Sequence, residues 1–281
     1  SYANTLRNMG LNVTNSTYSD NVTIAVHSKL HGKYTVNIND AVYTVTVMTG
    51  IGNLSVKKSA DIYKSTVDLA ETMNYLSSSA YCMLKVNKNG EYIYNTTSNL
   101  IVTYSNPITL FVKTYADTTG DVTFTDLTNN RVLGSCPINT ELILGGVSAG
   151  VYLINASYNG ESNYQSNWKI INLTVNPIYD DVLVISFNNY TYGLNTKIKT
   201  NTAKYSDVTG NVSYYIDGEL FNTSKIGEEI VLSNIKAGKH VIKTVYHDDS
   251  NYIFENITSI LIVKQADSTM NSSDDKIPYS L

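Results

Sequence analysis

Histidine is the side chain that most often binds a transition metal or moves a proton near neutral pH, and this sequence has four. None of His27, His31, His240 and His247 stands with Cys, Asp or Glu at the spacing of a zinc site. His27 and His31 lie along one predicted strand as a chance pair. The histidine pattern therefore predicts no metal site.

Recognisable motifs for catalysis are equally absent from the sequence. Serines are plentiful, but none sits in a Gly-x-Ser-x-Gly elbow. Gly145-Gly146 does not belong to a phosphate-binding loop, and we expect it to serve backbone geometry. No two carboxylates form the pair that glycoside hydrolases use. We therefore expect no catalytic residues, no cofactor and no enzymatic activity.

Two acidic pairs are the residues best suited to a hard cation. Asp180-Asp181 follow Pro177, and Asp248-Asp249 lie in a turn between two predicted strands. One hypothesis is that calcium, which prefers oxygen ligands, binds at the junctions between domains. The alternative, which we favour, is turn chemistry and solubility, because no Asp-x-Asp-x-Asp loop is present.

Asn-x-Ser/Thr sequons are frequent, and they accept a glycan only if the chain is exported and glycosylated. A chain rich in Asn, Ser and Thr also produces such sequons by chance, and Asn172 is one that lies within a predicted strand. The candidate glycosylation sites are Asn12, Asn21, Asn95, Asn155, Asn189 and Asn222.

Composition narrows the class of protein. The 281 residues carry a net charge of −4 with only 16% charged residues, so a nucleic-acid partner is excluded. Tyrosine is abundant at 23 residues, and with Val, Ile and Thr it favours strands. No apolar stretch reaches 18 residues, so we expect no membrane span. Cys82 and Cys136 do not share one repeat of the pattern below, so we expect two free thiols rather than a disulfide.

A fixed period organises the chain. An Asn-Tyr dipeptide recurs at spacings of 89 and 88 residues, and each tyrosine precedes a valine by 11 residues. The dipeptides are Asn74-Tyr75, Asn163-Tyr164 and Asn251-Tyr252, and the valines are Val86, Val175 and Val263. Upstream, Thr119-Gly120 matches Thr209-Gly210 and Ala149-Gly150 matches Ala237-Gly238, with weaker counterparts in the first copy.

A tyrosine also marks the entry to each copy, at Tyr18, Tyr104 and Tyr192, and Tyr279-Ser280 repeats this mark near the end of the sequence. The period predicts a first repeat over residues 10–87, a second over 88–176 and a third over 177–264. Residues 265–281 are then expected to be a linker and the start of a truncated fourth repeat.

Short strands separated by Gly, Asn and Asp turns are expected within each repeat, six or seven in number. In the third repeat they are Val182–Phe187, Thr196–Thr200, Asn211–Ile216, Glu219–Phe221, Glu229–Leu232, Lys239–Tyr246 and Ile257–Val263. Residues 62–76 also fit an amphipathic helix, but their alignment with residues 151–165 favours a strand and hairpin, with Asn159-Gly160 as the turn signal. Many short strands at this spacing predict a β-sandwich or barrel.

One position is specific to the immunoglobulin topology, in which a tyrosine near the start of the sixth strand bonds back to the preceding corner. Tyr152 fits that position, two residues before Ile154, and Tyr63 fits it in the first repeat. His240 stands there in the third repeat, so we expect an altered corner in that copy.

The Ala-Gly-x-Tyr corner, the strand after it and the segment Tyr158–Tyr164 resemble the bacterial Ig-like domain repeats (Big family), especially those of adhesin-like surface proteins of methanogenic archaea. Tyr246–Tyr252 carries the same motif, whereas Leu69–Tyr75 departs from it. The resemblance covers roughly residues 10–264 and implies an all-β chain of tandem immunoglobulin-like β-sandwich domains, located at the cell surface.

The function that follows is a non-catalytic stalk or spacer, a monomeric rod that projects a distal binding region from the cell. A host or microbial surface glycan or protein would then bind through other parts of the full-length protein. Two alternatives stay open: loops of this segment bind a glycan or protein directly, or the segment is an accessory module of a large cell-wall enzyme. We assign structural roles to Tyr63, Tyr152, His240, Tyr75, Tyr164 and Tyr252.

Overall fold

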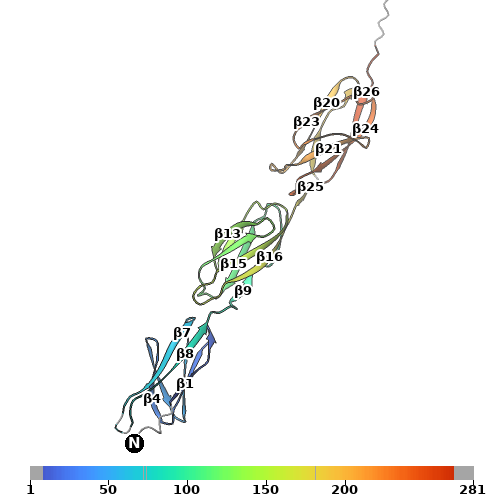
Figure 1. Ribbon diagram of the computed structural model, residues 1–281. Helices are drawn as coiled ribbons and strands as arrows, with labels where there is room; N and C mark the ends of the chain where they lie inside the picture. Colours follow the sequence, from blue (N-terminus) through green and yellow to red (C-terminus); the bar gives the residue numbers. More distant parts are fainter. Residues whose placement is uncertain (1–8, 72, 74, 181, 269–281) are drawn as a thin grey trace, which may run out of the picture. The chain divides into compact units, whose positions relative to one another are not determined.

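The computed structural model describes residues 9–71, 73, 75–180 and 182–268 (Figure 1). Asn74, Asp181 and the mark Tyr279-Ser280 lie outside the described residues, as does the rest of the proposed fourth repeat after residue 268. The described chain forms strands joined by turns, and no helix occurs among the described residues.

The strands fall into three consecutive sets, which we call the first, second and third repeat. The first contains β1 (Gly10–Val13), β2 (Ser16–Thr17), β3 (Val22–His27), β4 (Gly32–Ile38), β5 (Ala41–Val47), β6 (Ile51–Val56), β7 (Asp61–Leu69) and β8 (Ser78–Asn87). The second contains β9 (Ile93–Thr96), β10 (Asn99–Thr103), β11 (Ile108–Thr114), β12 (Asp121–Asp126), β13 (Arg131–Pro137), β14 (Glu141–Leu144), β15 (Gly150–Tyr158) and β16 (Asn167–Asn176). The third contains β17 (Ile178–Asp180), β18 (Leu183–Ser186), β19 (Tyr190–Thr191), β20 (Asn195–Thr202), β21 (Asn211–Ile216), β22 (Glu219–Lys225), β23 (Glu229–Ser233), β24 (Gly238–His247), β25 (Tyr252–Phe254) and β26 (Ile257–Lys264).

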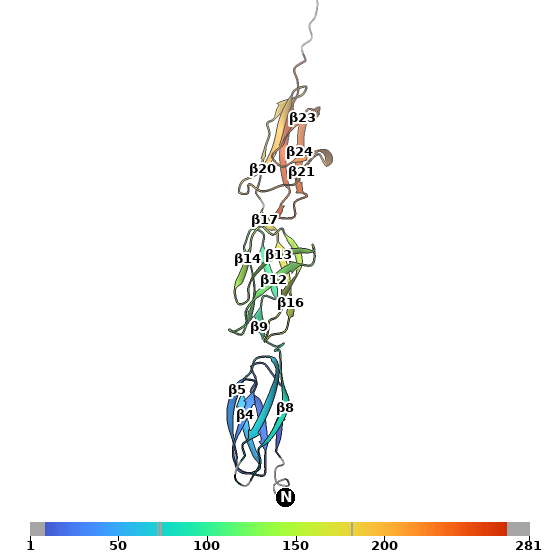
Figure 2. The ribbon, with the colours of Figure 1, turned by 60° about the vertical axis from the view of Figure 1, so that its left-hand side comes forward.

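Each repeat has a five-stranded and a three-stranded sheet. The five-stranded orders are β2-β8-β7-β4-β5, β10-β16-β15-β12-β13 and β19-β26-β24-β21-β22, and the three-stranded orders are β1-β3-β6, β14-β11-β9 and β18-β20-β23. Figure 2 shows β4, β5 and β8 of the first repeat running alongside one another. The short strands β2 and β19 pair in parallel with β8 and β26, the last strands of their repeats. This arrangement confirms the predicted tandem immunoglobulin-like β-sandwiches.

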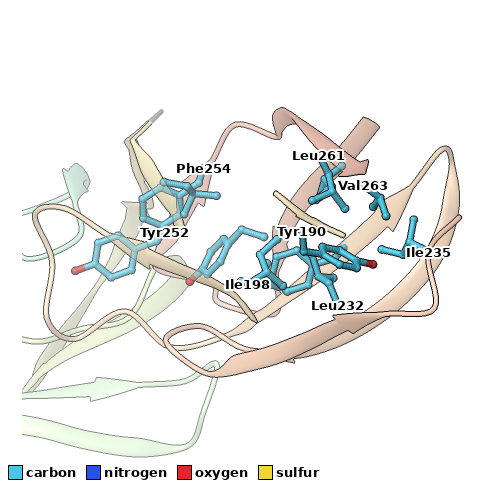
Figure 3. Packing of buried hydrophobic residues seen from close by; sticks show 13 residues of the cluster. Tyr190, Ile198, Leu232, Ile235, Tyr252, Phe254, Leu261 and Val263 are labelled. Atoms are coloured by element: carbon cyan, nitrogen blue, oxygen red, sulfur yellow. The ribbon is translucent and has the colours of Figure 1, made fainter. Parts of the chain in front are cut away.

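The core of each sandwich follows from alternation along the strands. In β3 and β4, buried and more exposed residues alternate, so one face of each strand is apolar and turns inward. Figure 3 shows the result in the third repeat, where Leu261 and Val263 of β26 point toward Leu232 and Ile235. Val86, Val175 and Val263, the valines that recur in the period, are all buried.

The strand interpretation of residues 62–76 is confirmed for its first half, because β7 runs from Asp61 to Leu69. All seven strands expected in the third repeat are present, most with ends shifted by one or two residues. The short strands β17, β19 and β25 were not expected. They are too short for sequence periodicity, and they exist because neighbouring chain segments pair with them.

The turns differ in how well local chemistry predicted them. Asp217-Gly218 joins β21 to β22 with positive φ at both residues, as a tight hairpin requires. Asn159-Gly160 instead opens a longer connection, since β15 ends at Tyr158 and β16 begins at Asn167. The extra residues are held by tertiary contacts described below, which override the two-residue hairpin that the dipeptide favours.

The chain packs as two compact units. The first comprises Ser1–Leu100, Ile108–Leu144 and Tyr152–Leu173, and the second comprises Ile101–Pro107, Gly145–Val151 and Thr174–Leu281. Both cysteines are free thiols, with Cys136 buried and Cys82 half-buried. Among the described residues, no helix is long and apolar enough to cross a membrane.

Truncating Leu110 tests the packing of the second repeat. Leu110 on β11 is fully buried, so we expect Leu110→Ala to lower the free energy of unfolding by about 2–5 kcal/mol. Trp168 is the only tryptophan and lies on β16, so its fluorescence during urea unfolding reports this repeat. Ile143→Ala on β14 is the matched control, because that side chain is 65% exposed and its truncation should cost about 0.5 kcal/mol. Equal losses in the two variants would contradict the core assignment.

Candidate functional site: a repeated joint between sandwiches

A carboxylate of the second repeat is shared by two tyrosines, one from the second repeat and one from the first. Asp117, in the loop between β11 and β12, accepts hydrogen bonds from the hydroxyls of Tyr18 and Tyr164, both at 2.6 Å. The two rings meet edge to face, with centroids 5.4 Å apart. All three residues belong to the first compact unit. We call this arrangement and the backbone bonds around it the first joint.

Backbone groups of the linker complete the first joint. The Asn163 side chain accepts a hydrogen bond from the Ala60 N–H at 2.9 Å, and its backbone carbonyl accepts one from the Asn89 N–H at 2.8 Å. Asn89 and Tyr164 form a parallel β-bridge. The linker after β8 is therefore not a free tether, because it pairs with the Asn-Tyr segment of the second repeat.

The second joint repeats the same contacts within the second compact unit. Asp207 accepts hydrogen bonds from the hydroxyls of Tyr104 at 3.1 Å and Tyr252 at 2.6 Å. These two rings also meet edge to face, with centroids 5.6 Å apart. Tyr205 packs against Tyr252 from another side, with centroids 4.9 Å apart. Figure 3 shows Tyr252 at one end of the third core with its hydroxyl directed away from the buried side chains.

The backbone bonds of the second joint match as well. The Asn251 side chain accepts a hydrogen bond from the Ala149 N–H at 2.7 Å, and its carbonyl accepts one from the Ile178 N–H at 2.8 Å. The linker forms β17, which pairs in parallel with β25 and places Ile178 beside Tyr252. One set of contacts therefore occurs twice in this chain, with the same residue types at the central positions.

The electrostatics of both joints favour an ionised carboxylate between two neutral phenols. The hydrogen bonds from Tyr164 and Tyr18 lower the pKa of Asp117, and those from Tyr252 and Tyr104 lower the pKa of Asp207. Burial, together with the bond to the aspartate, raises the pKa of Tyr164 and of Tyr252. The joints can therefore hold two chain segments together without a metal ion or a buried, unsolvated charge.

In the second and third repeats, the segment before the Asn-Tyr dipeptide bonds to the Thr-Gly loop of the same repeat. Tyr158 donates to the Thr119 carbonyl at 2.9 Å, and Glu161 accepts from the Thr119 hydroxyl. Burial raises the pKa of Tyr158 to about 12. In the third repeat Tyr246 donates to the Thr209 carbonyl at 2.5 Å.

The acidic pair of the third repeat takes part in the same loop. Asp249 accepts from the Thr209 N–H at 2.9 Å, and Asp248 accepts from the Asn211 side chain at 2.9 Å. These contacts correspond to the turn chemistry favoured for the pair. Among the described residues, no group of three or more His, Cys, Asp or Glu side chains is arranged to hold a metal ion.

The corner positions bond back along their own chain. Tyr63 donates to the carbonyl of Ser59 at 2.9 Å, and the Nε2 atom of His240 lies 2.7 Å from the carbonyl of Lys236. Both acceptors stand four residues before the side chain, so the histidine uses the bond that tyrosine makes in the first repeat. Tyr152 is half-buried at the matching position on β15. Tyr75 is half-buried after β7, beside Asn74, which lies outside the described residues.

A second contact distinguishes His240 from the corner tyrosine Tyr63. Its Nδ1 atom lies 2.6 Å from an Asp217 carboxylate oxygen, while Asp217 also accepts from the Val241 N–H. Because a carbonyl and a carboxylate both accept, both contacts are hydrogen bonds when the two ring nitrogens both carry protons. This contact with Asp217 raises the pKa of His240.

The remaining histidines belong to separate local contacts. His27 lies 3.3 Å from the Asn12 side chain, and His31 is exposed. His247 lies 2.8 Å from the Ser213 hydroxyl and 2.6 Å from Asp248.

A groove of about 640 Å³ lies beside the first joint. Lys57 and Lys58 line it together with Asp20 and Asp117. The Lys58 ammonium lies over the rings of Tyr43 and Tyr63, at 5.5 and 5.6 Å from their centroids, so it packs against its own repeat. Gly146 and Val147 stand at the matching positions before Ala149, so the two lysines are not part of the repeated joint.

The sequons differ in exposure. Asn12, Asn21, Asn95, Asn189 and Asn222 are exposed. Asn155 is half-buried on β15, and its side-chain oxygen Oδ1 is buried without a hydrogen-bond partner. The side chain of Asn189 accepts a hydrogen bond from the Ile262 N–H at 2.8 Å. A glycan at Asn155 would therefore require local opening of the sandwich, whereas the exposed sequons need none.

The two aspartates at the centre of the joints were not singled out from the sequence. A signal existed, because Tyr115-Ala116-Asp117 and Tyr205-Ser206-Asp207 form a recurring Tyr-x-Asp one residue before the aligned Thr-Gly dipeptides. The tyrosines Tyr18 and Tyr104 were recognised as marks of the period but without a role. Their function depends on a partner about 100 residues away, which local patterns do not reveal.

The sequence matches no family model and no curated protein. Solved structures that match this chain include the fibronectin(III)-like modules of Clostridium thermocellum CbhA, at 16% identity over 64% of this chain and 98% of that one, with a TM-score of 0.28. An I-band fragment of titin is 13% identical over 93% of this chain and 98% of that one, with a TM-score of 0.32. The first three fibronectin domains of chicken CNTN1 are 8% identical over 91% and 99%, with a TM-score of 0.27.

Removing one phenol should weaken the hold on Asp117. We expect Tyr164→Phe to raise the pKa of Asp117 toward the ordinary value of about 3.9, as measured by carbon NMR of the carboxyl group during acid titration. Because folding lowers this pKa, the stabilisation is present above about pH 4 and is lost as the pH falls through the lowered value.

The control for this titration is Tyr115→Phe, which removes a neighbouring hydroxyl but leaves both donors to Asp117. An Asp117 titration that is the same in Tyr164→Phe and in the unmodified protein would rule out the shared carboxylate.

The altered corner predicts an opposite dependence on pH. Because folding raises the pKa of His240, its contribution is complete below about pH 6.5 and is lost as the pH rises through the raised value. We expect Asp217→Asn to lower the pKa of His240, measured from the imidazole proton shifts between pH 5 and 9. Asp248→Asn, which changes the carboxylate beside His247, should leave the His240 titration unaltered. A raised pKa that persists in Asp217→Asn would refute the role of this contact.

Proposed function

We propose that this chain is a non-catalytic spacer whose sandwiches are held in series by tyrosine–aspartate joints. The observation that carries the proposal is the recurrence of the joint: the same hydrogen bonds surround Asp117 and Asp207. A linker that is hydrogen-bonded to the next repeat and held by a charge-assisted hydrogen bond resists bending more than a free tether does. The proposal takes residues 10–87, 88–176 and 177–264 as the three repeats.

The setting that we propose is the cell surface, in an adhesin-like protein related to the bacterial Ig-like domain repeats. The segments Tyr158–Tyr164 and Tyr246–Tyr252 carry the resemblance, and the joints give a physical role to the tyrosine that ends each segment. A distal region of the full-length protein would bind a surface glycan or protein. The exposed sequons at Asn12, Asn21 and Asn95 are then available for glycans.

Direct adhesion by this segment is the other function weighed from the sequence, and a cluster of exposed aromatic side chains in one repeat alone would favour it. Among the described residues, exposed aromatic side chains occur in all three repeats. They are Tyr81, Tyr94, Tyr115, Trp168, Tyr179 and Tyr192. Their spread over the chain supports the spacer over a single binding repeat.

Small-angle X-ray scattering tests the spacer. Three sandwiches of roughly 35–40 Å each, placed end to end, give a radius of gyration of about 32 Å. A compact globule of this length would give about 19 Å. We expect the larger value, the mass of a monomer from the forward scattering, and no change on adding Ca²⁺. A compact particle would overturn the spacer, and stiffening with Ca²⁺ would restore calcium sites at the linkers.

The contribution of the joints is tested by a double substitution in the same experiment. Asp117→Asn with Asp207→Asn removes both anions, so we expect a broader distribution of distances and a smaller maximum dimension. The matched control, Asp40→Asn with Asp121→Asn, changes the net charge equally at exposed residues outside the hydrogen-bonded set. Identical scattering from the two double variants would show that the joints do not set the stiffness.

A further inference from the structure

The third repeat carries, beside its last strand, a tyrosine in the position of Tyr18 and Tyr104. We call the side of a joint that supplies this tyrosine the tyrosine half, and the side that supplies the aspartate the aspartate half. The Tyr192 N–H donates to the Lys264 carbonyl at 2.8 Å. The corresponding bonds run from Tyr18 to Asn87 at 2.8 Å and from Tyr104 to Asn176 at 2.7 Å. The parallel pairs β2–β8 and β19–β26 place Tyr18 and Tyr192 in the same register. Tyr192 is therefore positioned as the donors of the two formed joints are.

Exposure separates the third repeat from the other two. Tyr18 and Tyr104 are half-buried in their joints, whereas Tyr192 is 51% exposed. Ala237 matches Ala60 and Ala149, whose N–H groups donate in the joints, and it is exposed where they are half-buried.

Ala266 shows the same contrast, because it follows Lys264 by two residues. Asn89 and Ile178 stand in that position after Asn87 and Asn176, and both are half-buried. We call Tyr192, Ala237 and Ala266 the open joint surface. Its three members are the positions that lose exposure when a joint forms.

The contacts of the formed joints define what would fit this surface. The partner must present a carboxylate to the tyrosine hydroxyl, and an asparagine must accept from two backbone N–H groups. The second and third repeats carry these groups, but Tyr18 and Tyr104 already occupy their aspartates. In the first repeat, Lys29 stands where the alignment places Asp117, three residues before the Gly32 that matches Gly120. Within the described residues, a second copy of this chain therefore offers no unoccupied aspartate at the aligned position.

We propose that the open joint surface binds a further immunoglobulin-like repeat that carries a Tyr-x-Asp loop and an Asn-Tyr segment. The bound repeat would place its aspartate against the Tyr192 hydroxyl and its asparagine against the N–H groups of Ala237 and of the residue at position 266. This inference rests on the proposed function, because it requires that such joints hold in solution. It adds the identity of the partner and the polarity of the series, with the tyrosine half preceding the aspartate half.

The test is a chain in which residues 177–264 are duplicated in frame between Lys264 and Gln265. The duplication joins Lys264 to Pro177 of the copy, as Asn176 is joined to Pro177 in the natural sequence. A Lys239→Arg change in the copy makes its peptides distinguishable by mass. Hydrogen exchange is then measured by mass spectrometry with single-residue fragmentation, at Ala149, at the original Ala237 and at the copied Ala237.

We expect the original Ala237 amide to exchange about tenfold or more slowly than the copied one, which has no repeat after it. Ala149 reports an existing joint in the same molecule. If Ala149 is protected while the two Ala237 amides exchange alike, the inference is overturned and the spacer stands. If Ala149 is unprotected as well, the joints do not hold and both proposals fail.

Two substitutions in the duplicated chain separate a specific joint from mere proximity. Tyr192→Phe in the original repeat removes the hydroxyl donor and should abolish most of the protection at the original Ala237. Tyr81→Phe removes an exposed hydroxyl on β8 of the first repeat and should leave that protection unchanged. Equal protection in both variants would overturn the role assigned to Tyr192.

Discussion

One carboxylate between two tyrosine hydroxyls is the interaction on which each connection between sandwiches depends. Asp117 and Asp207 each accept one hydroxyl from the preceding repeat and one from their own. Hydrogen bonds to an ionised acceptor are stronger than neutral ones, and two donors on separate oxygens fix a direction as well as a distance. Both aspartates are exposed, so this geometry is obtained without the full desolvation penalty of a buried charge.

In the second and third repeats, the segment that ends in Asn-Tyr contacts both its own sandwich and the preceding repeat. In the second repeat, Tyr158 and Glu161 close the Thr119 loop, which carries Asp117. Asn163 and Tyr164 contact Ala60 and Tyr18 of the first repeat. The loop that supplies the aspartate is thus tied to the segment that supplies its partner tyrosine. The first repeat has Leu69 in place of Tyr158 and Lys29 in place of Asp117. It therefore lacks both the tyrosine that closes the loop and the aspartate that the loop carries.

The altered corner of the third repeat follows the same chemistry with a different donor. Tyr63 bonds a carbonyl four residues before it with one hydroxyl, whereas His240 uses one nitrogen for that bond and offers the other to Asp217. Asp217 is also the first residue of the hairpin turn after β21, with a positive φ. The histidine therefore ties the corner to a neighbouring turn through its second ring nitrogen.

The sequence by itself determined the period, the all-β class and seven strands of the third repeat. These features depend on residues close together in the chain, such as the alternation in β24 and the Asp217-Gly218 turn. Only the tertiary structure decided the roles of Tyr18, Asp117 and Asp207, the short strands β17 and β25, and the long connection after Asn159-Gly160. The physical reason is that each of these pairs with a partner from a distant segment, so neither local propensity nor spacing contains the contact that stabilises it.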